Sequence, residues 1–135
     1  MAEANLRIGI IGAGDVGTHL ARLFFNAGDE VFLCTSDGKA DFLSGFPNEK
    51  VVAEPKMLPD NLDLVLFTRR DRDLQLVLDA LDKNNTLVHC SGSMDMNLLS
   101  SFNHYGVFYP LQTFRKELAL SNKNFPVFIE ASDEM

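Results

Sequence analysis

The chain has 135 residues, of which 46% are hydrophobic and 23% are charged, a balance typical of one folded domain and unlike a disordered or coiled-coil protein. A net charge of −7 argues against nucleic acid and anionic membrane as partners. No apolar run reaches the roughly 18 residues of a membrane span, and the N-terminus lacks the basic start of a signal peptide, so we expect a cytoplasmic protein.

The first half of the chain alternates between strand and helix patterns. Residues 7–11 are a β-branched run that stops at Gly12, which is typical of a strand buried on both faces. Residues 15–27 place apolar side chains on one helical face, and Gly28 stands where a left-handed C-terminal cap is expected. The next predicted elements are a strand over 31–34, a weak helix or turn over 38–46 and a strand over 51–53.

The same alternation continues in the second half. Residues 63–68 give the strongest strand pattern of the chain, and the apolar spacing after it predicts a helix over 71–82. The remaining predicted elements are strands over 86–90, 106–109 and 126–130 and a short helix over 94–102. This order predicts an α/β fold, a doubly wound and mostly parallel sheet of about seven strands between helix layers. Ligands in such sheets bind beyond the carboxyl ends of the strands.

One glycine-rich segment stands where the first strand meets the first helix. Its residues are Gly12, Ala13, Gly14, Asp15, Val16 and Gly17. The three glycines suit a tight turn, a close approach of backbone to a pyrophosphate and close packing of helix on strand, in that order. The first-turn N–H groups and the helix dipole would hold the anion. The alternative is a glycine-rich turn with no ligand. We expect the Asp15 carboxylate to point outward, where it complements the helix dipole.

The end of the second predicted strand should select between NAD and NADP. An acidic residue at this position accepts hydrogen bonds from a ribose 2′-hydroxyl and excludes a 2′-phosphate. Here Thr35 and Ser36 offer hydroxyls and Lys39 adds a positive charge, which favours NADP. Asp37 keeps NAD as the alternative, and ordinary turn chemistry explains the two hydroxyls equally well.

The order of the later motifs resembles that of a known family. A strand ending in Thr68 is followed by Asp71, then by His-Cys-Ser-Gly-Ser over 89–93 and by Tyr-Pro-Leu-Gln-Thr-Phe over 109–114. Over nearly its whole length the chain resembles the Rossmann-like NAD(P)-binding domain of predicted NADP oxidoreductases. These are related to the coenzyme F420-dependent NADP oxidoreductases, the pyrroline-5-carboxylate reductases and the 6-phosphogluconate dehydrogenase-like proteins.

The resemblance implies hydride transfer between NADP(H) and a small, acidic substrate. It also implies a helical second domain after residue 135, which in the family usually dimerises and completes the substrate site. Residues 1–135 would then be the nucleotide-binding domain alone, inactive by itself, of a protein that forms a homodimer. A non-catalytic nucleotide-binding or sensing module and a partner-interaction domain are the alternatives.

Two segments depart from the family pattern. The loop after the fourth strand, which the resemblance places beside the cofactor, contains Phe67, Thr68 and Arg69. Arg69 is the preferred contact to a phosphate or carboxylate, whereas Arg70 and Arg72 are expected to be solvated. Where relatives have a histidine, this chain has Tyr109, and a tyrosine does not exchange protons near neutral pH as a histidine does.

The other polar candidates lie late in the chain. The resemblance places Ser91 and Ser93 near nicotinamide and substrate, so Ser91 and Tyr109 are weak catalytic candidates; capping of a helix from Met94 explains the serines equally well. His89 is expected to be a hydrogen-bonded core residue and His104 a surface turn residue. Cys34 and Cys90 are expected to be reduced and partly buried, and three scattered histidines predict no metal site.

Eight of the 11 phenylalanines divide into two groups. Those expected in the core are Phe24, Phe32, Phe67, Phe108 and Phe128. Those expected near a second domain, with some of them exposed, are Phe102, Phe114 and Phe125.

Overall fold

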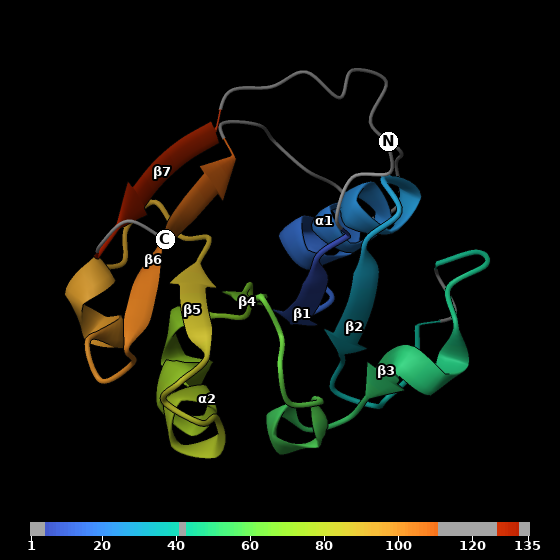
Figure 1. Ribbon diagram of the computed structural model, residues 1–135, viewed down its shortest axis with the longest axis horizontal. Helices are drawn as coiled ribbons and strands as arrows, with labels where there is room; N and C mark the ends of the chain where they lie inside the picture. The colour runs from blue at the N-terminus through green and yellow to red at the C-terminus, as the bar shows by residue number, and fades with distance from the viewer. Residues whose placement is uncertain (1–4, 41–42, 111–126, 133–135) are drawn as a thin grey trace.

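The computed structural model describes residues 5–40, 43–110 and 127–132. Within these residues, seven strands form one sheet in the order β3-β2-β1-β4-β5-β6-β7 (Figure 1). The strands are β1 (Arg7–Ile11), β2 (Glu30–Cys34), β3 (Val51–Val52), β4 (Leu64–Phe67), β5 (Thr86–His89), β6 (His104–Pro110) and β7 (Val127–Ala131). All neighbours pair in parallel except β6 and β7, which are antiparallel. The predicted doubly wound, mostly parallel α/β fold is confirmed.

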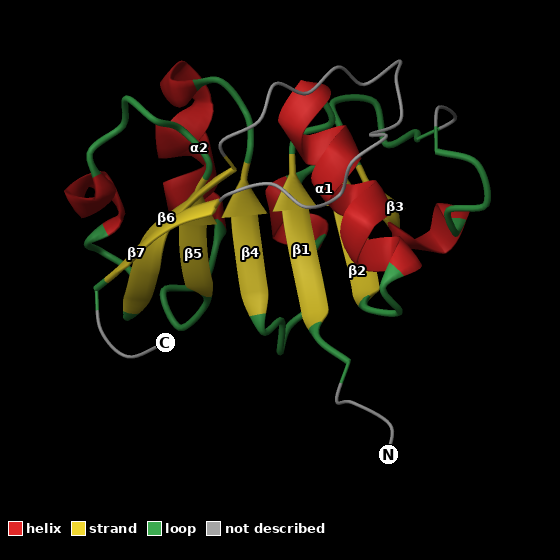
Figure 2. Ribbon diagram, turned by 90° about the horizontal axis from the view of Figure 1, so that it is seen from above, coloured by secondary structure: helices red, strands yellow, loops and turns green. Residues whose placement is uncertain are grey.

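Helices cover both faces of this sheet (Figure 2). Helix α1 (Asp15–Asn26) buries Leu20 in one hydrophobic core, and α2 (Leu74–Ala80) buries Val77 in the other. Strand β4 serves both cores, because Leu66 joins the α1 side and Phe67 joins the α2 side. Four short 3₁₀-helices occupy connections in the described residues: η1 (Asn48–Lys50), η2 (Pro55–Met57), η3 (Asp71–Asp73) and η4 (Met96–Leu99).

The strand order reverses between β1 and β4. From β1 the chain builds outward through β2 to β3, and from β4 it builds in the opposite direction to β7. The connections that leave the carboxyl ends of β1 and β4 therefore diverge, which opens a crevice at this point of a doubly wound sheet. The glycine-rich segment lies here, between the end of β1 and the start of α1.

The helix predicted over 15–27 forms as α1, whereas the other helices are shorter than predicted. Gly28 has a φ of +95° just beyond α1, as a left-handed cap requires. The helix predicted over 71–82 is η3 followed by α2, and it ends at Ala80. The helix predicted over 94–102 is wrong: only η4 forms, because Asp, Asn and Ser side chains on both sides compete with helical hydrogen bonds. Of the segment 38–46, residues 41–42 lie outside the described residues and the remainder forms turns.

One aromatic prediction is wrong: Phe128, expected in the core, has 51% of its surface exposed because β7 is an edge strand. Phe102, one of three phenylalanines of which some are expected to be exposed, is 3% exposed. Phe67 is fully buried as predicted, whereas Phe24, Phe32 and Phe108 are half-buried. Phe114 and Phe125 lie outside the described residues. In the part of the chain that the structure describes, no helix is long and apolar enough to cross a membrane.

Candidate functional site

Two of the three loop glycines are required by the fold itself. Gly12 has a φ of +116°, and a Cβ there would lie 2.6 Å from the Thr68 Oγ1. A Cβ on Gly17 would collide with the Gly12 carbonyl oxygen and with the same hydroxyl. These contacts arise because the first turn of α1 packs directly against the ends of β1 and β4. Gly12 and Gly17 therefore let the helix approach the sheet, as the sequence predicts.

Gly14 is different, because no neighbour among the described residues restricts it. A Cβ built on Gly14 would meet no heavy atom of residues 5–40, 43–110 and 127–132 within 4 Å, and its φ of −79° suits any residue. Gly14 is the N-cap of α1, so it offers no side chain to the N–H groups of the first turn. The space in front of Gly14 is the place where a bound anion would meet these N–H groups and the positive end of the helix dipole.

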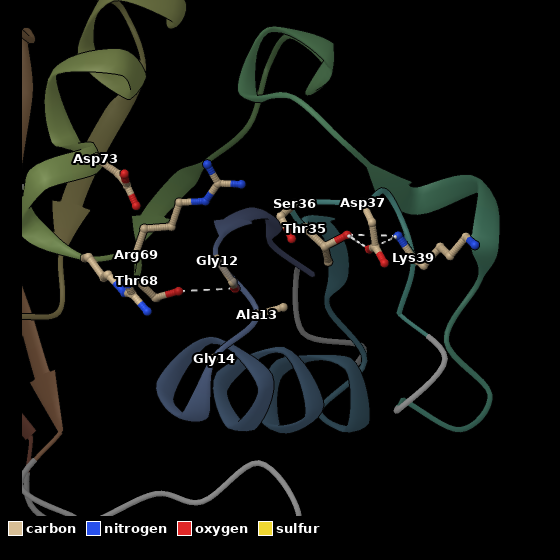
Figure 3. A pocket seen from close by; sticks show the side chains of 11 residues that line it. Gly12, Ala13, Gly14, Thr35, Ser36, Asp37, Lys39, Thr68, Arg69 and Asp73 are labelled. Carbon is tan, nitrogen blue, oxygen red and sulfur yellow. Dashed lines mark hydrogen bonds between the residues drawn. The ribbon is translucent and has the colours of Figure 1, made fainter.

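A cavity of about 680 Å³ opens at this place (Figure 3). Three segments line it: the glycine loop at 12–14, the turn after β2 at 35–39 and the loop after β4 at 68–73. Lys39, Arg69 and Arg70 bring positive charge, and Asp37 and Asp73 bring negative charge. The lining is thus net positive in a chain whose net charge is −7. This cavity is suited to an elongated ligand that carries phosphate groups.

Arg69 lies across the glycine loop. Its Cγ would be 3.1 Å from a Cβ on Gly12, and Figure 3 shows its guanidinium extending from the end of β4 toward the turn after β2. Burial raises the pKa of the Cys34 thiol at the end of β2, and the Arg69 charge partly opposes this shift. Arg69 therefore lies close to the ends of three strands, β4, β1 and β2.

The turn after β2 is held by its own side chains. Thr35 is buried, and its hydroxyl donates to Asp37 Oδ1 at 3.2 Å and accepts from the Lys39 N–H at 2.9 Å. Asp37 Oδ1 also accepts from the Lys39 N–H, at 3.0 Å. The Thr35 hydroxyl is therefore engaged in the turn, while the exposed Ser36 lines the cavity.

Of the remaining residues predicted to contact the cofactor, only some line the cavity. Thr68 lines the cavity, but its hydroxyl donates to the carbonyls of Ile11 at 3.0 Å and Gly12 at 3.2 Å, so it supports the loop. Ala13 lines the cavity, and Asp15 is exposed outside its lining. Val16 is half-buried against the α1-side core, and Phe67 is buried in the α2-side core. Their side chains do not reach the cavity, so only their backbone could contribute.

Sequence reasoning did not single out Asp73. Asp73 lines the cavity from the end of η3, and Arg70, expected to be solvated, is exposed and lines the same cavity. Arg72 is exposed and outside the lining, as expected. The proximity of 70 and 73 to the strand end at 67 is the one signal in the sequence that points to them. Because this loop begins with η3 instead of a regular helix, helical periodicity could not place these side chains.

Ser91 and Tyr109 belong to a second cavity, of about 420 Å³. The Tyr109 ring covers Gly92, since a Cβ on Gly92 would lie 3.0 Å from the ring Cζ. The hydroxyls of Ser91 and Ser93 lie 3.2 Å apart, and the Ser93 N–H donates to the Ser91 Oγ. The alternative that they cap a helix is not supported, because the N-cap of η4 is Asp95, which accepts from the Asn97 N–H at 2.9 Å.

His89 is fully buried, but its hydrogen bonding is incomplete. Nδ1 accepts from the Ser91 N–H at 3.1 Å, so His89 is a buried residue with a hydrogen bond, as predicted, although Nε2 meets no partner within hydrogen-bond distance among the described residues. Burial lowers the pKa of His89, and the backbone of Met94 and the charges of Asp71, Asp95 and Glu130 partly oppose this shift. His104, expected in a turn, is exposed at the start of β6. Gln112 lies outside the described residues.

The cysteines do not form a reactive pair. Both are free, Cys34 is fully buried and Cys90 is half-buried. Burial raises the pKa of the Cys90 thiol to about 12, which keeps it protonated at neutral pH. Among the described residues, no three His, Cys, Asp or Glu side chains gather as a metal ion would require.

Comparison with solved structures supports the fold. A presumed NADP oxidoreductase from Bacteroides fragilis is 29% identical, with a TM-score of 0.76, over 96% of this chain and 52% of that one. A PanE/ApbA family ketopantoate reductase from Ralstonia eutropha is 21% identical, with a TM-score of 0.60, over 90% of this chain and 48% of that one. Prephenate dehydrogenase from A. aeolicus, solved with NAD⁺, is 14% identical, with a TM-score of 0.60, over 96% of this chain and 51% of that one.

The chain therefore spans about half the length of these solved proteins. No curated protein matches it. The family model described as NADP oxidoreductase, coenzyme F420-dependent, matches residues 7–91, which is more than half of the chain. The predicted resemblance is thereby confirmed. The chain belongs to the family of coenzyme F420-dependent NADP oxidoreductases.

Proposed function

We propose that the chain is the cofactor-binding domain of an oxidoreductase that transfers hydride between NADP(H) and a small, acidic substrate. The observation that carries this proposal is the open space before Gly14, at the start of α1, inside a cavity with a net positive lining. A nicotinamide dinucleotide, when bound, supplies the hydride chemistry. The protein's own residues would bind its phosphates, orient it along the strand ends and hold the substrate.

The cavity has the parts that such a cofactor requires. The first-turn N–H groups of α1 face the space before Gly14 and would donate to the pyrophosphate. Arg69, which crosses the glycine loop, would neutralise phosphate charge. Gly12, with Thr68 beneath it, keeps the loop close to the sheet, so that the cradle is already formed before any ligand binds.

We infer NADP as the cofactor from the turn after β2. Ser36 and Lys39 line the cavity there, and both can donate to a 2′-phosphate. Asp37, the one acidic residue of the turn, already accepts through Oδ1 from Thr35 and from the backbone of Lys39. That engagement holds the carboxylate in the turn, so it competes with a role as acceptor for a ribose 2′-hydroxyl.

The experiment is a calorimetric titration with NADPH and NADH. We expect tighter binding of NADPH, and Lys39→Gln should weaken NADPH by about fivefold while leaving NADH unchanged, as loss of one exposed charge contact predicts. Lys56→Gln is the control, because Lys56 is an exposed lysine outside the cavity lining. Equal affinities for both cofactors, unaffected by Lys39→Gln, would contradict the NADP assignment. Absence of binding by either cofactor would contradict the proposed function.

The proposals for the substrate and for the assembly are less specific than the proposal for the cofactor. Arg70 is exposed on the cavity wall, where its guanidinium could bind a substrate carboxylate. The solved proteins are about twice as long as this chain, which supports a second half that completes the substrate site and forms a homodimer. We propose that hydride transfer needs that second half.

A non-catalytic nucleotide sensor is the second candidate, and Tyr109 favours it. Its ring lies over Gly92, so a phenol stands at the position where the family resemblance gives an imidazole. Turnover of NADPH by the full-length protein, in the presence of small imino and keto acids, separates the two functions. Binding of NADPH without any turnover by the full-length protein would support the sensor.

A further inference from the structure

The second cavity lies next to the first along the same edge of the sheet. Ser91 and Gly92, which follow β5, line the second cavity, and Thr68 and Arg69, which follow β4, line the first. Strands β4 and β5 are parallel neighbours, and such strands lie about 5 Å apart. A substrate in the second cavity would therefore lie beside a cofactor in the first.

One wall of the second cavity is a patch of four side chains on β6 and β7. In the antiparallel register Tyr109 pairs with Phe128 and Val107 pairs with Glu130, and all four line the cavity. Paired residues on one sheet face have Cβ atoms about 5 Å apart. Two aromatic residues are thus cross-strand neighbours, with a carboxylate two residues further along β7. Phe128 keeps 51% of its surface exposed, so its ring is accessible to a ligand.

The charges of this cavity are opposite to those of the first. Its charged lining residues among those described are Asp95, before η4, and Glu130, and no Lys, Arg or His joins them. The two carboxylates come from separate elements but act on one imidazole. Burial lowers the pKa of His89, and the charges of Asp71, Asp95 and Glu130 all oppose that shift. Both carboxylates line the same cavity, one from the segment before η4 and the other from β7.

We propose that the second cavity binds a small organic cation, an alkylammonium ion whose charge lies between Asp95 and Glu130 and whose carbon chain lies against Tyr109 and Phe128. Carboxylates complement the positive charge, and the faces of aromatic rings attract cations. The cavity volume of about 420 Å³ accommodates a molecule of this size. The cation site itself does not depend on the proposed function. Only the statement that its ligand is the substrate rests on that function. The acid group proposed above and the cationic group can belong to one molecule.

The test is a titration with two probes of equal length and opposite charge, butylammonium and butyrate, followed by NMR. We expect butylammonium to give saturable shifts of the backbone amide signals of Gly92 and Glu130, both with and without NADPH. Butyrate should give none. No saturable shift with butylammonium, or equal binding of butyrate, would overturn the inference.

Charge-neutral variants locate the site. Asp95→Asn keeps an N-cap residue on η4, and Glu130→Gln keeps the shape of the side chain, so both should fold. Each should weaken butylammonium by about fivefold. Glu49→Gln is the control with the same change of charge, because Glu49 is exposed on η1 outside this cavity. Unchanged affinity in both cavity variants would overturn the inference.

Titration of NADPH in the same samples separates the two proposals. If NADPH binds and butylammonium does not, the cation site is wrong and the proposed function stands. If NADPH does not bind, the proposed function is wrong, and binding of butylammonium then supports a cation site without the role of substrate.

Discussion

Three glycines within six residues show how one residue type serves different purposes. A Cβ on Gly12 or on Gly17 would collide with the Thr68 hydroxyl, and one on Gly17 also with the Gly12 carbonyl, whereas a Cβ on Gly14 meets none of the described residues. The spacing in the sequence predicts all three. It does not show which hydroxyls are already engaged: Thr35 and Thr68, both predicted to bind cofactor, have hydroxyls bonded within the protein. Such competition depends on atomic distances between separate elements, which no pattern in the sequence encodes.

His89 makes the stability of the fold depend on pH. Burial lowers its pKa below 6.5, and a histidine whose pKa is lowered on folding contributes full stability above its unfolded value and loses it as the pH falls. Protonation of Nδ1 would also break the bond from the Ser91 N–H. We therefore expect the melting temperature to fall as the pH drops from 6.5 toward about 5.

The variant His89→Asn isolates this effect, because its amide oxygen can still accept from the Ser91 N–H but does not titrate. The variant should be less stable at every pH, since it leaves part of the ring volume empty. The fall in melting temperature over that pH range should be smaller than in the wild type. An identical pH profile in scanning calorimetry would show that another group is responsible.

At the level of elements, α1 packs so close to the end of β1 that Gly17 has no room for a Cβ. We expect Gly17→Ala to lower the free energy of unfolding by about 2 kcal/mol or more, because the new Cβ collides with the Gly12 carbonyl. Gly14→Ala adds the same methyl group at the N-cap of the same helix, where nothing opposes it, and should cost less than about 1 kcal/mol. Urea unfolding of both variants measures the difference. Equal losses would contradict the packing described for α1.

The elements that the sequence predicts best are those with a strong period and a clear end. Strand β1, helix α1 and strand β2 follow the predicted ranges within a residue or two, because apolar periodicity and Gly12 and Gly28 mark their limits. The helix expected over 94–102 fails for a local reason: polar residues around η4 bond to nearby backbone. The antiparallel direction of β7 has no local signal, since strand direction depends on the path of the connection.

For the whole molecule, the net charge of −7 does not show that two cavities have linings of opposite net charge. The first is lined by Lys39, Arg69 and Arg70, and the second by Asp95 and Glu130. Composition argues correctly for a folded α/β domain, but it averages over these local fields. Composition likewise does not show which apolar residues are exposed. On the edge strand β7, Phe128 and Ile129 are 51% and 67% exposed.

The central claim is that the space before Gly14 holds the cofactor pyrophosphate. Calorimetric titration of Gly14→Val with NADPH tests it most directly, because the backbone of Gly14 accepts a β-branched residue and the added methyl groups meet no protein atom near the Cβ. We predict that the variant keeps the melting temperature of the wild type within a few degrees and binds NADPH at least about tenfold more weakly. A folded Gly14→Val protein that binds NADPH as tightly as the wild type would contradict the account.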